Sequence, residues 1–333
     1  MTVAEIVDEV KARGEDAVRE WALQLDGIEP ARATPGGDLP ADAVRDLARR
    51  VRAWHEAQRP ADLRMEIEPG VELERRWVQL ESVGIYVPRS LVSTLVMCAV
   101  PAQAAGVERI VVMTPPRGSE LVAAAAELLG IDEVWAVGGA QAIAALAYVH
   151  RVDKIVGPGN AFVNEAKLLV SRDVAIDLPA GPSEVVVVLG RGGDRAIAEL
   201  ELAAQREHGH EAMCELLEAD DLDAALRRVN ELAPEHVVLL GEAESLASRI
   251  RNAGAVFVGA SSPVASGDYA TGGNHVLPTG RWARSTGGLG LETFLKPVTT
   301  QRLTPDGLAL VRPTVEALAA VEGMVAHAQA VAR

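Results

Sequence analysis

Apolar residues follow two different patterns along the chain. In residues 1–58 they recur at helical spacing, as in Ile6, Val7 and Val10, which predicts two amphipathic helices. The Gly27–Pro40 stretch, rich in proline and glycine, separates them. At the other end of the chain, Pro313–Arg333 has apolar residues along one side and predicts a terminal helix.

From about residue 76, short β-branched runs alternate with alanine-rich helical stretches. The predicted strands are Val83–Val87, Arg109–Thr114, Glu133–Val137, Lys154–Val156, Glu184–Leu189, Met213–Ala219, His236–Leu240 and Ala255–Val258. The predicted helices are Val96–Gly106, Glu120–Leu129, Ala140–Tyr148, Ala161–Ser171, Arg195–Arg206 and Leu222–Glu231. Continuous apolar strands separated by helices indicate parallel sheets buried on both faces. We therefore expect an α/β fold with two Rossmann-like parallel-sheet domains, a helical N-terminal segment and a helical C-terminal tail.

Charge and composition narrow the classes of partner. The net charge of −15 would repel a polyanion, which argues against nucleic acid. The longest apolar stretch, around Leu91–Ala105, is broken by polar residues and proline, so we expect no membrane span. Two cysteines, Cys98 and Cys214, are too few for a disulfide framework, and the N-terminus lacks a signal-peptide pattern. A cytoplasmic protein that binds a small molecule is the expectation.

Three segments could supply metal ligands. Gln205 and His208 are spaced to share one face of a helix. A glycine-rich segment, Ser266–His275, carries Asp268 and His275 on an expected tight loop, and the terminal helix carries Glu322 and His327 around an unusual mid-helix glycine, Gly323. Each segment alone is also typical of solvated helix faces or ordinary turns.

Glu235 and His236 precede an apolar strand and suit proton transfer, because imidazole titrates near neutral pH. In an extended chain the two side chains would point to opposite faces, so they share a site only if the chain turns near Pro234.

Glycine turns at Val137–Gln141 and Val156–Asn160 each follow a strand and begin a helix, as phosphate-binding turns do, although neither is GxGxxG.

Read in order, these segments resemble the histidinol dehydrogenase family. The strings that carry the resemblance, from about residue 4 to 331, are Val83-Gly-Ile-Tyr-Val-Pro88, Val137-Gly-Gly-Ala-Gln141, Val152-Asp-Lys-Ile-Val-Gly-Pro-Gly-Asn-Ala-Phe-Val163, Ala180-Gly-Pro-Ser-Glu184, Gln205-Arg-Glu-His208, Ala233-Pro-Glu-His236, Ile250-Arg-Asn-Ala-Gly254, Gly267-Asp-Tyr269, Gly273-Asn-His-Val-Leu-Pro278 and Glu322-Gly-Met-Val-Ala-His327.

The resemblance implies a role for each matched residue. One Zn²⁺ per subunit would be bound by Gln205, His208, Asp268 and His327, which also hold the substrate through the metal. His236 would be the general base, with Glu235 activating water in a second step. Ser183, His275 and Glu322 would contact the substrate, and Tyr86, Gln141 and Asn160 would contact NAD. The implied reaction is oxidation of L-histidinol to L-histidine through L-histidinaldehyde, with two hydride transfers to NAD.

The resemblance also implies an organisation into domains and subunits. We expect residues 1–85 and 185–289 to form one Rossmann-like domain, and 86–184 a second one that binds NAD. Residues 290–333 would form a tail that crosses to the partner of a homodimer, so that active sites are shared. The chain is shorter than typical members after Pro88, after Tyr148 and between His208 and Glu235, which makes it a compact variant.

Three other functions fit parts of the pattern. A related NAD-linked dehydrogenase could oxidise another polyol or a sulfonated alcohol, although the Glu322 carboxylate suits a cationic amine. A zinc hydrolase could use Glu235 to activate water, but it would leave the glycine turns without a purpose. A catalytically inactive dimeric binding protein would not need the Glu235–His236 pair.

Overall fold

The structure is a computed structural model that describes residues 2–179, 181–207, 209 and 211–332. The chain forms two compact units. The first comprises Met1–Gln58 and Leu80–Phe294, and the second comprises Arg59–Gln79 and Leu295–Arg333. Among the described residues, no helix combines the length and hydropathy that a membrane span requires.

The N-terminal segment of the first unit contains three helices, α1 (Val3–Arg13), α2 (Glu15–Leu25) and α3 (Ala41–Glu56). The prediction of two helices was wrong because Gly14 adopts φ 63°, which ends α1 and starts α2 in a new direction. Thr2 caps α1 in a reciprocal capping box with Glu5. The buried apolar positions of α1 and α2 pack in one cluster with the strands and helices of a five-stranded sheet.

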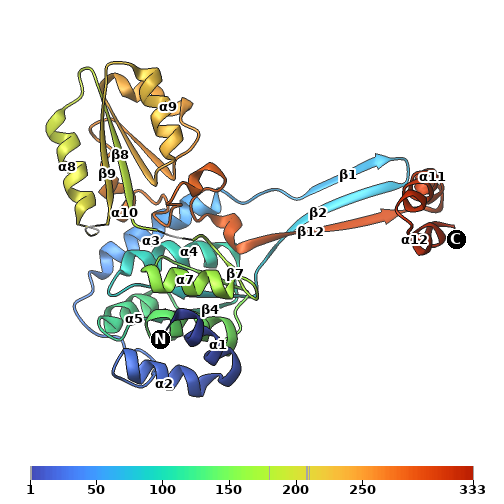
Figure 1. Cartoon of the computed structure of the whole chain (residues 1–333), viewed down its shortest axis with the longest axis horizontal. Helices are drawn as coiled ribbons and strands as arrows, with labels where there is room; N and C mark the ends of the chain where they lie inside the picture. The colour runs from blue at the N-terminus through green and yellow to red at the C-terminus, as the bar shows by residue number, and fades with distance from the viewer. Residues whose placement is uncertain (1, 180, 208, 210, 333) are drawn as a thin grey trace. The chain divides into compact units, whose positions relative to one another are not determined.

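This sheet has the order β5-β4-β3-β6-β7, and all of its strand pairs are parallel. The strands are β3 (Ser82–Tyr86), β4 (Arg109–Thr114), β5 (Glu133–Ala136), β6 (Lys154–Val156) and β7 (Ala175–Ile176). The intervening helices are α4 (Val92–Ala105), α5 (Ser119–Leu128), α6 (Gly139–Ala144), the π-helix η1 (Ala145–Val149) and α7 (Ala161–Val170). Helices α1 and α2 lie on one side of the sheet, and α3 and α4 lie on the other (Figure 1).

A second parallel sheet in the same unit has the order β11-β10-β8-β9. Its strands are β8 (Glu184–Gly190), β9 (Met213–Ala219), β10 (His236–Leu240) and β11 (Ala255–Val258). Its helices are α8 (Arg195–Arg206), α9 (Leu222–Leu232), the 3₁₀-helix η2 (Gly241–Arg249) and the short α10 (Val264–Tyr269). Separate apolar clusters cover its two faces, which confirms the prediction of strands buried on both sides.

The second unit is an antiparallel sheet of order β1-β2-β12 followed by two helices. Its elements are β1 (Leu63–Glu68), β2 (Val71–Gln79), β12 (Leu295–Leu303), α11 (Pro305–Val321) and α12 (Val325–Val331). This sheet was not predicted, because none of its strands is a continuous apolar run; apolar and charged residues alternate along β1 and the start of β2. The prediction of one terminal helix was also wrong: Glu322 ends α11, and Gly323 adopts φ 70° between α11 and α12.

The predicted domain boundaries stay a prediction, but two details differ from the observed packing. Strand β3 includes Tyr86 and therefore crosses the expected boundary between residues 85 and 86. The N-terminal helices pack with the five-stranded sheet, whereas we expected them to belong with residues 185–289. The α/β class with two parallel sheets is confirmed.

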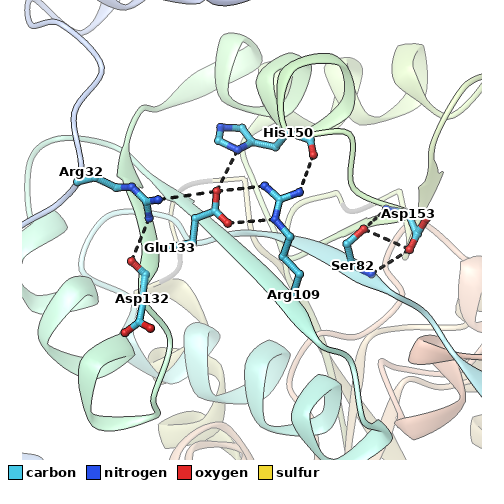
Figure 2. Close-up of polar contacts among 7 residues, drawn as sticks. All are labelled: Arg32, Ser82, Arg109, Asp132, Glu133, His150 and Asp153. Atoms are coloured by element: carbon cyan, nitrogen blue, oxygen red, sulfur yellow. Dashed lines mark hydrogen bonds and ion pairs between the residues drawn. The ribbon is translucent and has the colours of Figure 1, made fainter.

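A polar network lies at the amino ends of the strands of the five-stranded sheet (Figure 2). Arg109 of β4 binds Glu133 of β5 through two hydrogen bonds of 3.1 Å, and the Nδ1 atom of His150 lies 3.3 Å from the same carboxylate. Asp153 accepts hydrogen bonds from the backbone N–H and the hydroxyl of Ser82. These contacts fix strand starts, so the opposite, carboxyl edge is the one available for ligands.

Candidate active site

A cavity of about 510 Å³ lies between the carboxyl edge of the five-stranded sheet and the amino edge of the four-stranded sheet. It is bordered by the turn after β6, the segment before β8, the start of β10 and helix α10. Six of the predicted site residues line it: Asn160, Ser183, Glu235, His236, Asp268 and His275. The structure thus brings together residues more than a hundred positions apart in the sequence.

Glu235 and His236 face this cavity together although they are adjacent in the sequence. Ala233 adopts a left-handed conformation with φ 49°, so the chain turns just before the pair and β10 begins at His236. Both side chains are buried, and Nδ1 of His236 lies 3.6 Å from Oε2 of Glu235. The turn that the sequence required for a shared site is therefore present.

The backbone carbonyl of Glu184 fixes the orientation of the His236 ring. The Nδ1 atom of His236 lies 3.1 Å from this carbonyl oxygen. A carbonyl oxygen can only accept a hydrogen bond, so Nδ1 must carry the proton. In the neutral ring, Nε2 then has the lone pair that a general base needs.

Burial raises the pKa of the Glu235 carboxyl group to about 8, and the negative charges of Glu184 and Asp268 add to this effect. A hydrogen bond of 2.9 Å from the backbone N–H of Glu184 acts in the opposite direction. The result is a carboxyl group that changes charge near neutral pH, which is the range in which a proton-transfer group is useful.

Asp268 and His275 lie on adjoining segments of the cavity wall. Nδ1 of His275 lies 3.1 Å from the backbone oxygen of Asp268, and Nε2 lies 3.5 Å from Oγ1 of Thr94. Asp268 is in the last turn of helix α10, so the expectation that a tight loop carries it was wrong. The start of α10 is bound to α8, because Oε2 of Glu201 accepts a hydrogen bond of 3.1 Å from the Val264 N–H.

The predicted metal ligands are distributed over both units. Gln205 is 3% exposed near the end of α8, and its Nε2 atom has no hydrogen-bond partner among the described residues. His208 lies outside the described residues, while His327 belongs to the second unit, as does Glu322, the predicted substrate contact. In the part of the chain that the structure describes, no group of three or more His, Cys, Asp or Glu side chains could hold a metal ion. The four-ligand site stays a prediction.

A second cavity, of about 560 Å³, contains all three residues predicted to contact a cofactor: Tyr86, Gln141 and Asn160. It shares Pro88, Leu91 and Asn160 with the first cavity, so the two adjoin along one wall. The Oε1 atom of Gln141 is buried without a hydrogen-bond partner among the described residues. A buried acceptor of this kind is available to a ligand.

Asp26, at the end of α2, also lines the second cavity and was missed by the sequence analysis. Its Oδ2 atom accepts hydrogen bonds of 3.1 Å from the Gly138 N–H and from Nε2 of Gln141. The hydroxyl of Tyr86 accepts a hydrogen bond of 3.2 Å from the Gly139 N–H, and burial raises the pKa of Tyr86 to about 12. Asp26 lies in a segment of turn residues, so no local sequence signal marks it.

A buried ion pair holds the turn between the two cavities. Lys167 and Asp177 are almost completely buried and form a short contact. Nζ of Lys167 donates a hydrogen bond of 2.9 Å to the Gly157 carbonyl, and the Gly157 N–H donates one of 2.7 Å to Asp177. The ion pair thereby fixes the Gly157–Asn160 turn, which leads to the wall that the cavities share.

The fold and the site together define the class of this protein: it is an α/β enzyme with two parallel sheets and two adjoining small-molecule cavities. A sequence model of the family described as histidinol dehydrogenase matches residues 1–221 and 215–333. The chain therefore belongs to the histidinol dehydrogenase family, whose members are oxidoreductases.

Similar proteins agree over nearly the whole chain. The histidinol dehydrogenases of Methanosarcina barkeri and Caulobacter vibrioides are 38% and 39% identical, over 99% and 98% of this chain and 90% of each relative. The crystal structure of histidinol dehydrogenase from Elizabethkingia anophelis superposes with a TM-score of 0.91 at 29% identity, covering 99% of this chain and 90% of that one.

The alignments also bear on the predicted deletions. The alignment with the Methanosarcina barkeri protein spans 392 positions, whereas this chain has 333 residues, so the relative has residues that this chain lacks. The two matched ranges of the family model overlap at residues 215–221, which lie within and just after β9. This position falls inside the stretch between His208 and Glu235 where the largest deletion was expected.

Proposed function

We propose that this protein oxidises L-histidinol to L-histidine in two steps, through L-histidinaldehyde, with NAD as the hydride acceptor and one Zn²⁺ per subunit. The family membership supports the overall reaction. The single observation that carries the mechanism is the buried Glu235–His236 pair, which faces a cavity adjoining a second, cofactor-sized cavity.

His236 would remove the proton from the substrate alcohol. Its Nδ1 atom is bound to the Glu184 carbonyl, so the lone pair is on Nε2 when the ring is neutral. As the alcohol loses this proton to Nε2, its carbinol carbon loses a hydride, and the product is the aldehyde. Bound NAD supplies the acceptor for that hydride.

Glu235 would act in the second step, when the aldehyde is oxidised. Its carboxylate can take a proton from a water molecule that adds to the aldehyde carbonyl, which gives the anion of the aldehyde hydrate. Loss of a hydride to a second NAD and of the remaining hydroxyl proton from this anion gives the carboxylate of histidine. Because free aldehydes are reactive, a site walled by several segments also keeps the intermediate from escaping.

Gln205, His208, Asp268 and His327 are the residues that would hold zinc. Support comes from the buried amide of Gln205, whose Nε2 atom has no hydrogen-bond partner among the described residues, and from the position of Asp268 on the cavity wall. Bound zinc would anchor the amino and imidazole nitrogens of the substrate, because it is a borderline-soft ion that accepts nitrogen and oxygen ligands. Ser183, His275 and Glu322 would complete the contacts to the substrate.

Tyr86, Gln141 and Asn160 would hold NAD in the second cavity. The unused Oε1 atom of Gln141 supports this assignment, as does the wall formed by Asn160 between the cavities. A hydride can pass only between atoms in contact, so adjoining sites for cofactor and substrate are what the reaction requires.

The second unit supports the proposal of a homodimer with shared active sites. The helices that carry Glu322 and His327 expose large apolar side chains, and Val321 and Val325 are 86% and 68% exposed. Apolar surface of this kind is typical of an interface with another subunit. A tail that reaches the partner would place Glu322 and His327 in the partner's site. The reaction needs no nucleic acid and no membrane, and the cytoplasm is the compartment we propose.

The experiment that tests this function supplies purified, zinc-loaded protein with L-histidinol and NAD and identifies the product by chromatography. L-histidine should accumulate only when both substrates are present. A product that stops at the aldehyde, or no product at all, would contradict the proposal. The same protein should leave sulfonated alcohols unoxidised, which distinguishes it from a related dehydrogenase.

A further inference from the structure

Glu184 connects three parts of the catalytic cavity without lining it. Residues 184 and 235 exchange hydrogen bonds: the Glu184 N–H donates to Oε2 of Glu235 at 2.9 Å, and the Glu235 N–H donates to Oε2 of Glu184 at 3.2 Å. The other carboxylate oxygen of Glu184 accepts a hydrogen bond of 2.9 Å from the Gly280 N–H. Its backbone carbonyl faces Nδ1 of His236.

The Gly280 contact extends the connection to Ser183. Thr279 is buried, and its hydroxyl accepts a hydrogen bond from the Gly181 N–H. The Thr279–Gly280 loop therefore holds the Gly181–Glu184 segment at both ends, with Ser183 between the two contacts. Gly280 adopts φ 59°, a conformation that lets its N–H reach the carboxylate in a tight turn.

We propose that Glu184 is a positioning residue, whose carboxylate fixes Glu235, His236 and Ser183 relative to one another. The inference rests on the proposed function for its kinetic consequences, but its geometry is independent of cofactor and metal. Glu184 is only partly buried and does not line the catalytic cavity. A direct chemical role is therefore not required to explain the contacts.

Two backbone donors depend on this carboxylate. Replacing it with an amide leaves one oxygen for the N–H groups of Glu235 and Gly280, and the amide NH₂ group would face the other donor. If the amide NH₂ group faces the N–H of the buried residue Glu235, the unmet donor is costly enough to displace the backbone there. Because the register pairs His236 with Val185, a shift at the start of β8 moves the imidazole as well.

The test compares Glu184→Gln and Glu184→Asp with the wild-type protein and with a control, Glu127→Gln, which changes an exposed glutamate on α5. The first readout is the tautomer of the His236 ring, from ¹⁵N NMR spectra assigned with His236→Asn. The wild-type ring should carry its proton on Nδ1. In Glu184→Gln the two tautomers should exchange, while Glu127→Gln should match the wild type.

The second readout is kinetic. We expect kcat to fall by roughly 10- to 100-fold in Glu184→Gln, as is usual when a catalytic group loses its orientation. The KM for NAD should stay within about twofold of the wild-type value, because Glu184 does not line the cavity proposed for NAD. Glu184→Asp, which keeps the charge on a shorter side chain, should be intermediate and guards against misfolding of the amide variant. An unchanged tautomer and an unchanged kcat would overturn the inference. If the wild-type protein does not oxidise histidinol, the proposed function fails, and the NMR comparison still decides the role of Glu184.

Discussion

The Nδ1 atom of His236 lies 3.6 Å from Oε2 of Glu235, and these two buried side chains face one cavity. Two residues adjacent in a strand would point to opposite faces. The left-handed turn at Ala233 and the start of β10 at His236 remove that constraint. An imidazole and a carboxyl group of raised pKa thus lie within reach of the same ligand, as the proposed two-step oxidation requires.

Replacing the proposed base should separate catalysis from metal binding. His236→Asn keeps a polar side chain of similar size but cannot take a proton at neutral pH, so we expect turnover to fall by roughly 10²–10⁴-fold. Zinc content, measured by atomic emission, should equal that of the wild type. A loss of zinc together with activity would instead make His236 a metal ligand.

The raised pKa of Glu235 predicts a pH dependence of stability. Burial moves this pKa from 4.5 in the unfolded chain to about 8 in the folded protein, so the unfolded carboxyl group is the stronger acid. The stabilisation by the neutral carboxyl group is complete below pH 4.5 and is lost as pH rises through 8. Glu235→Gln, which stays neutral, should therefore gain several degrees in Tm relative to wild type at pH 9 in metal-free protein, and almost nothing at pH 4.5. Equal differences at both values would refute the assignment.

Asp26 should affect cofactor binding. Its carboxylate orients Gln141 and accepts the Gly138 N–H in the cavity proposed for NAD. Asp26→Ala should raise the Kd for NAD, measured by titration calorimetry, by roughly tenfold, as expected for losing about 1.4 kcal/mol of binding free energy. The control is Asp42→Ala, since Asp42 is fully exposed on α3. If the two variants bind NAD equally well, Asp26 has no role in this cavity.

The shared-site hypothesis predicts complementation. His327→Ala should lower zinc content, because a proposed ligand is removed. Mixing His327→Ala with His236→Asn should restore part of the activity, since one site of a mixed dimer would combine an intact His236 with an intact His327. Activity that stays at the sum of the two separate variants would show that each chain completes its own site.

The sequence predicted the buried parts of this protein better than the exposed ones. The strands around Val185–Val188 and Val237–Leu240 are continuous apolar runs, and they lie where expected. The antiparallel sheet of the second unit escaped prediction because it contains no continuous apolar run. Its apolar residues alternate with charged ones such as Glu72 and Glu74, which form ion pairs with Arg302 on the surface of the sheet.

The residues of the candidate site also differ in how well the sequence predicts them. Family strings located Glu235, His236 and Ser183, because these residues are embedded in recognisable turns. Glu184 and Asp26 could not be identified from the sequence, since their importance arises from contacts with Gly280 and Gln141, residues distant along the chain. Contacts of this kind depend on the folded backbone and leave no local pattern.

The number of NADH molecules formed per molecule of L-histidinol consumed tests the central claim most directly. With zinc-loaded protein and excess NAD, our account predicts two NADH per histidinol, because the Glu235–His236 site carries out both oxidations before product leaves. A yield of one NADH with histidinaldehyde released to solution, or no NADH, would contradict it.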